Sequence, residues 1–175
     1  MPVLTHTGLQ VPDPQFRVTA LSIPPELDGA LLADLHLDGV EERIGAIITG
    51  PAGLTLGVHP CYLDAFEAFA AAASRGGAPV ERDLLCQLLV DEYHCALVIA
   101  AAVDGEHVAR LIVGQTVATF VLLDRVPADD AGRLALAHAI ARQHAQLLGR
   151  DPSATAGGTW ELWTGGAWQP LGLSK

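Results

Sequence analysis

The chain has 175 residues, of which 50% are hydrophobic and 17% are charged, and its mean hydropathy is +0.33. This composition excludes an intrinsically disordered chain and predicts one domain with a complete core plus an appendage. Twenty acidic against ten basic residues give a formal net charge of −10, which argues against binding to nucleic acid or to an anionic membrane.

The cysteine content and the length of the apolar runs indicate the expected cellular compartment. The three cysteines, Cys61, Cys86 and Cys95, are an odd number at low density, which suits free thiols in a reducing compartment. The longest apolar runs, 95–103 and 111–123, are shorter than the roughly 18 to 20 residues that span a bilayer. The first residues lack the basic region and continuous apolar stretch of a secretory signal. We therefore expect a cytoplasmic protein with no transmembrane helix.

The first part of the chain predicts an extended segment, a helix and a hairpin. Residues 1–25 are rich in proline and are expected to form an extended N-terminal segment with one plausible strand at 16–23. Residues 26–37 carry leucines at helical spacing and predict a helix. The apolar runs 44–49 and 54–58 flank the sequence Gly-Pro-Ala-Gly, so two antiparallel strands joined by a hairpin loop are expected.

Two helical patterns follow. Residues 61–74 predict a helix that ends near Gly76, where a left-handed C-terminal cap belongs. The apolar face of this helix consists of Leu63, Phe66, Phe69, Ala70 and Ala73. Leucines in residues 80–92 also recur at helical spacing, although the run Leu-Leu-Val could begin a strand; we favour a helix.

Residues 95–124 contain three short apolar runs separated only by Asp104-Gly105 and Gly114-Gln115. Tight turns between such runs predict a three-stranded antiparallel meander. The next segment, 131–149, predicts a long helix, because acidic residues precede it and apolar residues recur along one side.

All three tryptophans lie in the last 16 residues, after a linker at 151–158. Gly165-Gly166 fits a two-residue hairpin turn, which would place Trp163 opposite Trp168 on one face and Trp160 on the other. An isolated hairpin is marginally stable in water, so one face is expected to dock on this protein or on a partner. Docking on the protein itself is favoured over a ligand role.

These elements together predict an α+β fold: an antiparallel sheet of about five strands with helices packed on it, plus a C-terminal Trp-rich β-hairpin. The expected organisation is an N-terminal segment over 1–25, one domain over 26–150, and a linker with the hairpin over 151–175.

The order of elements resembles the roadblock/LC7 family. The resemblance rests on GAIITGPAGLTLGV as a first hairpin, the alanine-rich helix after it, and VARLIVGQTVATFVLLD running into DDAGRLALAHAIARQH. It implies a roadblock-like domain that dimerises and acts as a non-catalytic scaffold or regulator of small GTPases. The extra helical pattern, the proline-rich start and the tryptophan tail depart from a minimal domain of that family.

Two surfaces are candidates for partner binding. The run Ala70 to Ala73 would allow close helix approach across a two-fold axis, although these alanines could equally fit against the protein's own sheet. Aromatic side chains dominate the energetics of protein interfaces. The candidate partner-binding residues are Trp160, Trp163, Trp168, Phe66 and Phe69.

A rival interpretation starts from histidines and cysteines. Imidazole and thiolate are ligands that zinc prefers, but the Cys-x2–4-Cys spacing of structural zinc sites does not occur. Cys86 and Cys95 could instead act as small apolar residues, and Cys61 could be activated at a helix N-terminus. The alternative metal or thiol site would use His59, Cys61, Cys86, His94 and Cys95.

Acid–base pairs are possible at Asp91-Glu92 with His94 and at Glu106-His107, although both suit solvated strand ends. No nucleotide-binding, hydrolase or zinc-protease motif is present. The sequence therefore favours a homodimeric adaptor or regulatory scaffold, without a cofactor, that binds a protein partner. The alternative is a metal- or thiol-dependent enzyme, or a zinc-binding protein.

Overall fold

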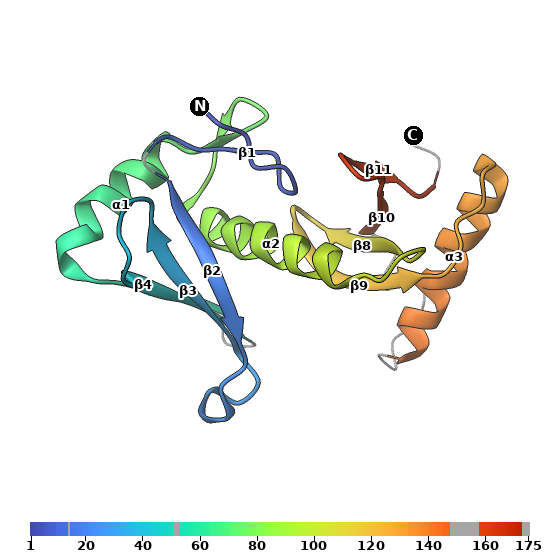
Figure 1. Ribbon diagram of the computed structural model, residues 1–175, viewed down its shortest axis with the longest axis horizontal. Coiled ribbons are helices and arrows are strands. Elements are labelled where there is room, and N and C mark those ends of the chain that lie inside the picture. Colours follow the sequence, from blue (N-terminus) through green and yellow to red (C-terminus); the bar gives the residue numbers. More distant parts are fainter. Residues whose placement is uncertain (14, 51–52, 148–157, 173–175) are drawn as a thin grey trace. The chain divides into compact units, whose positions relative to one another are not determined.

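A computed structural model describes residues 1–13, 15–50, 53–147 and 158–172. The fold is α+β, with three antiparallel sheets and three α-helices among these residues (Figure 1). The chain divides after Leu97 into an N-terminal unit and a C-terminal unit, and the boundary falls inside helix α2 (Arg82–Ala101).

The N-terminal unit is built on a four-stranded sheet of order β2-β3-β4-β5. Its strands are β2 (Phe16–Ser22), β3 (Leu31–Leu37), β4 (Gly45–Gly50) and β5 (Gly53–Val58). Alternate side chains of these strands enter a core shared with α1 (Pro60–Ala72) and α2. The ring centroids of Phe16 on β2 and Phe66 on α1 lie 5.2 Å apart, edge to face.

The N-terminal residues belong to this unit. Strand β1 (Leu9–Gln10) pairs with β6 (Ser74–Arg75), which pairs with β7 (Ala78–Pro79) in a small sheet. Leu9 and Val11 are buried in the core. The Glu92 carboxylate on α2 accepts hydrogen bonds from the backbone N–H groups of His6 and Thr7, at 2.9 and 2.8 Å, and from the Thr7 hydroxyl.

The C-terminal unit is a second four-stranded sheet, of order β11-β10-β8-β9. Its strands are β8 (His107–Val113), β9 (Thr116–Leu123), β10 (Gly158–Trp163) and β11 (Trp168–Pro170). Helix α3 (Asp130–Leu147) packs on one face through Ala137 and Ile140, against a core that includes Leu111, Trp160 and Leu162.

The helix predicted over 26–37 is wrong. A 3-10 turn, η1 (Pro25–Leu27), is followed by strand β3, in which Ala33 and Leu35 are buried with a period of two. Asp28 and Gly29 both have positive φ, at 49° and 80°, and this left-handed backbone stops a helix. The leucines fit a helical spacing, but the chain turns before a helix can form.

The three-stranded meander is also wrong in its first strand, because Cys95–Ala101 is the last part of α2. Only β8 and β9 form a hairpin there, through the Gly114-Gln115 turn expected from the sequence. As a result, the single sheet of about five strands is replaced by two four-stranded sheets and one small sheet. The division after Leu97 differs from the single domain expected over 26–150, and residues 1–25 contribute to a core.

Other predictions are confirmed. The β4–β5 hairpin, the helix α1, a helix in the leucine-rich segment after it, and α3 all form. Trp163 pairs with Trp168 in the β10–β11 hairpin, which docks on the protein's own strand β8. The predicted linker at 151–158 lies outside the described residues, except for Gly158 at the start of β10.

Of the described helices, α2 alone has the length and composition of a membrane span, with a hydropathy of 1.5 in its most apolar window. The core helix of a soluble protein passes the same test. Seven α2 side chains are buried: Leu85, Cys86, Leu88, Leu89, Val90, Asp91 and Cys95.

Candidate functional site

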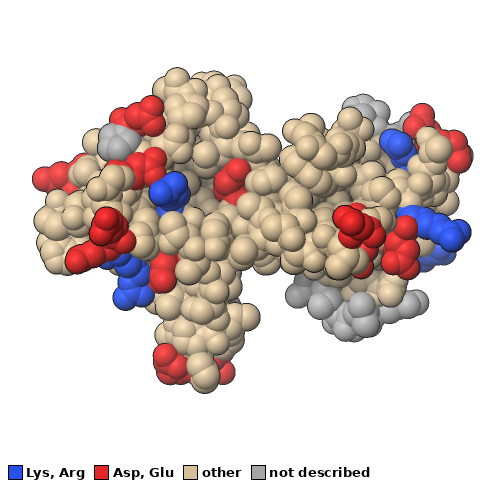
Figure 2. Space-filling view, in the orientation of Figure 1, with Lys and Arg blue, Asp and Glu red and all other residues tan. Residues whose placement is uncertain are grey.

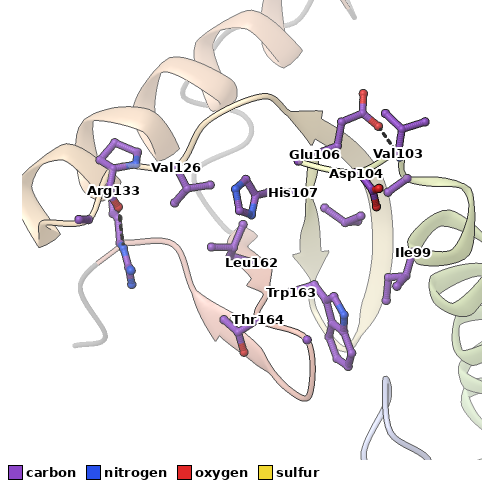
Figure 3. A pocket seen from close by; sticks show the side chains of 16 residues that line it. Ile99, Val103, Asp104, Glu106, His107, Val126, Arg133, Leu162, Trp163 and Thr164 are labelled. Atoms are coloured by element: carbon purple, nitrogen blue, oxygen red, sulfur yellow. Dashed lines mark hydrogen bonds between the residues drawn. The ribbon is translucent and has the colours of Figure 1, made fainter.

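A pocket of about 530 Å³ lies within the C-terminal unit, and this volume falls in the range of small-ligand sites. Three segments form its walls: the end of α2 with the turn to β8, the loop from β9 into α3, and the end of β10 with the following turn (Figure 3). Its apolar lining includes Ile99, Val103, Val126 and Leu162, with the Trp163 indole at the same end as Ile99.

Three polar side chains of the lining hydrogen-bond the backbone of the wall that carries them. The Glu106 carboxylate accepts from the Val103 N–H at 3.0 Å, at the turn after α2. The Arg133 Nε donates to the Pro127 carbonyl at 3.0 Å, and the Thr164 hydroxyl donates to the Ala167 carbonyl at 2.9 Å. Each bond links a lining side chain to the backbone of its own wall and orients that side chain.

The β9–α3 wall depends on close packing at the start of the helix. Asp129 caps α3, because its carboxylate accepts from the Gly132 N–H at 2.7 Å. A Cβ at Gly132 would lie 2.6 Å from the Pro127 Cβ, a separation that real atoms do not reach. Glycine at this position therefore lets the first turn of α3 approach Pro127, which lines the pocket.

His107, the first residue of β8, lies near the centre of the pocket between Val126 and Leu162 (Figure 3). Its side chain is exposed, as is that of Asp104 on the preceding turn. The charged side chains of the lining are two carboxylates, Asp104 and Glu106, and one guanidinium, Arg133. On the face shown in Figure 2, acidic side chains stand in several separate places and basic ones are fewer.

The sheet face opposite α3 carries a linked set of charged and aromatic residues. The buried Arg110 on β8 pairs with Glu161 on β10, with 2.7 Å between Nη2 and Oε2. Its guanidinium carbon lies 4.0 Å from the ring centroid of Trp168, a cation–π contact. The Trp163 and Trp168 ring centroids are 5.3 Å apart. These contacts hold the indole that borders the pocket.

The structure separates the predicted partner-binding residues. Phe66 and Phe69 are buried in the N-terminal core, and Trp160 is buried against α3. Trp163 and Trp168 are half-buried, and Trp163 lines the pocket. The predicted alanine run is also divided between core and surface: Ala70 and Ala73 are in the core, and Ala71 and Ala72 are exposed.

The proposed metal-ligand residues do not gather. Among the described residues, no group of three or more His, Cys, Asp or Glu side chains is arranged to hold a metal ion. Cys86 and Cys95 are buried, and burial raises the pKa of the Cys86 thiol to about 12. Burial also lowers the pKa of His94, which is half-buried.

One pair of that set does come together. His59 is the N-cap of α1, and its Nδ1 lies 2.9 Å from the Sγ of Cys61, an exposed thiol in the first helical turn. The Cys61 N–H also donates to this nitrogen, at 3.4 Å. An imidazole within hydrogen-bond distance of an exposed thiol is the arrangement of a base and a nucleophile.

Sequence reasoning identified part of the pocket. The Glu106-His107 pair was noted as an acid–base candidate, and Trp163 as a binding residue. Ile99, Val126 and Arg133 were missed, because nothing local in the sequence indicates that α2, the β9–α3 loop and β10 meet. No family model, curated protein or solved structure matches the chain.

Proposed function

We propose that the protein is a cytoplasmic, non-catalytic adaptor that holds a protein partner by receiving one of its side chains in the pocket of the C-terminal unit. The observation that carries this proposal is the construction of the pocket. Apolar side chains and an indole supply the contact area, and the few polar groups are bonded to the walls. Such a preformed recess lowers the ordering cost of binding.

The hydrogen bonds of the polar lining residues favour a binding role for the pocket over acid–base catalysis. The Glu106 carboxylate accepts from a backbone N–H and the Thr164 hydroxyl donates to a backbone carbonyl, so these bonds are made to the pocket walls and not to a catalytic partner. In contrast, interface hot spots are enriched in tryptophan, and the half-buried Trp163 lines the pocket.

Homodimerisation is part of the proposal, as the resemblance to the roadblock/LC7 family implies. Strand β5 supports it, because β5 ends its sheet and its sequence GLTLGV has no charged residue or proline to block pairing with another strand. The segments that carried the resemblance lie in two different sheets, around β4–β5 and β8–β9. A small-GTPase partner therefore rests on the resemblance alone.

The test is a selection from a random peptide library displayed on phage, with the full chain as bait. Ala128 lines the pocket and is exposed, so the Ala128→Trp change fills the recess. We expect enriched peptides that bind the wild type and not this variant. Failure to enrich any peptide, or equal binding to both proteins, would reject the pocket as the partner site.

A thiol-dependent role is the second candidate, and the 2.9 Å contact between His59 Nδ1 and Cys61 Sγ favours it. In this role the imidazole accepts the thiol proton and leaves an exposed nucleophile. The candidate predicts that the alkylation rate of Cys61 depends on His59.

A further inference from the structure

The pocket has an acidic end. Asp104 and Glu106 lie on the turn between α2 and β8, beside Ile99 and on the same side as Trp163 (Figure 3). Arg133, a residue of α3, lies at the opposite end, and its Nε donates a hydrogen bond to the Pro127 carbonyl. Asp104, Glu106 and Trp163 line the first end, where the Glu106 carboxylate is turned toward Val103, whereas the guanidinium of Arg133 is on the far side of His107.

Among the described residues, neither carboxylate of this end forms an ion pair with a basic side chain. Glu106 bonds a neutral backbone N–H, and in the described part of the chain Asp104 has no ion-pair partner. A cation entering here therefore gains attraction from two negative charges. The formal net charge of −10 adds a longer-range attraction for basic partners and a repulsion of acidic ones.

The walls at the same end suit the hydrocarbon stem of a basic side chain. Ile99 and Val103 supply apolar surface, and the Trp163 ring supplies a face of negative quadrupole. The same chemistry occurs within this sheet, where the Arg110 guanidinium carbon lies 4.0 Å from the Trp168 ring centroid. The sheet of the C-terminal unit thus already places one guanidinium against one indole.

From these contacts we propose that the pocket binds an arginine or lysine side chain of the partner, with the stem on Ile99 and Val103 and the cation between Asp104 and Trp163. This inference rests on the proposed function, because it names the chemistry of the residue that the same pocket receives. An acidic side chain is disfavoured at this end, because the negative charges of Asp104 and Glu106 would repel it.

The experiment uses the indole N–H signals of the ¹⁵N-labelled full chain, which contains three tryptophans. N-acetyl-arginine methylamide is titrated, with the norleucine and glutamate analogues as comparisons. The Trp163 signal is expected to shift and saturate, while that of Trp160, buried on the α3 side, stays in place. The norleucine analogue is expected to bind at least about fivefold more weakly, because it lacks the cation.

The charge is tested with Asp104→Asn, and Asp124→Asn is the matched control because Asp124 is exposed and does not line the pocket. We expect about threefold weaker arginine binding for the first variant and no change for the second. Equal shifts with all three analogues, no shift of Trp163, or no effect of Asp104→Asn would overturn the inference. Library peptides that bind the pocket without a basic residue would also overturn it, while leaving the adaptor proposal intact.

Discussion

Arg110 and Glu161 stand directly opposite each other on β8 and β10, and Glu161 Oε2 lies 2.9 Å from Nε and 2.7 Å from Nη2 of Arg110. The arginine side chain is 7% exposed and that of the glutamate 23%. This pair and the Trp168 ring together accommodate a buried guanidinium and attach the C-terminal hairpin to the sheet. The charge pair therefore holds Trp168, and the Trp168 ring packs against Trp163, which lines the pocket.

Replacing Arg110 is expected to destabilise the C-terminal unit. Arg110→Ala removes the ion pair and the stacking contact and leaves Glu161 partly buried without its partner, which we expect to cost about 2–4 kcal/mol. Urea unfolding followed by tryptophan fluorescence measures this directly, since all three tryptophans lie in this unit.

The matched control is Arg43→Ala, which removes the more exposed ion pair with Asp34 in the N-terminal unit. Its cost is expected to stay below about 1 kcal/mol by far-UV circular dichroism. If Arg110→Ala leaves the fluorescence transition where it was, the pair does not stabilise the hairpin.

The three thiols are expected to differ sharply in reactivity. Cys61 is exposed, whereas Cys86 and Cys95 are buried and the pKa of Cys86 is raised to about 12. At pH 7.5 a disulfide reagent should titrate one thiol in the folded protein and three in urea. His59→Asn keeps a good N-cap residue but removes the base, so we expect Cys61 to react several-fold more slowly in this variant. An unchanged rate would remove the support for a thiol-dependent role.

His94 is expected to make the N-terminal unit less stable in acid. Burial lowers its folded pKa below the ordinary value of 6.5, so the unfolded chain takes up the proton first. The contribution of a neutral His94 to the free energy of unfolding is therefore fully present above pH 6.5 and is lost as the pH falls through the folded pKa. Between pH 7.5 and pH 5, urea unfolding by circular dichroism should show a larger loss for the wild type than for His94→Asn. Equal losses would show that His94 is not the group responsible.

Strand β5 is expected to form the dimer contact by pairing with the same strand of a second copy. Thr55 is exposed on this edge strand, and a lysine there would oppose its symmetry mate across the antiparallel junction. Size exclusion with light scattering should find a dimer for the wild type and a monomer for Thr55→Lys. Glu67→Lys, an exposed change on α1, should remain a dimer. A wild-type monomer at micromolar concentration contradicts this part of the account.

The sequence predicted an element correctly where a turn or a helix cap determines the local structure. Gly114-Gln115 and Gly165-Gly166 set the registers of two hairpins, and the acidic residues before 131 introduced α3. The pairing of Trp163 with Trp168 followed from the second of these turns alone. Alternation of side chains then placed Trp160 on the opposite, buried face.

The wrong predictions concern apolar segments whose pattern fits both a helix and a strand. Leucines in 31–37 match both a helix and a half-buried strand, and this segment forms the strand β3, which pairs with β2 on one side and β4 on the other. Residues 95–101 read as a strand although they continue a helix, because short apolar runs do not distinguish the two. The pocket was not predictable as a whole, since it depends on contacts among α2, the β9–α3 loop and β10.

The most direct measurement is isothermal titration of a library-selected peptide into the full-length protein. One peptide is expected to bind each chain, and Ala128→Trp should weaken binding at least about tenfold because the indole fills the pocket. Ala139 is also exposed, lies on α3 and does not line the pocket, so the Ala139→Trp variant should bind as the wild type does. Equal affinity of the Ala128→Trp variant and the wild type would contradict the assignment of this pocket as the partner site.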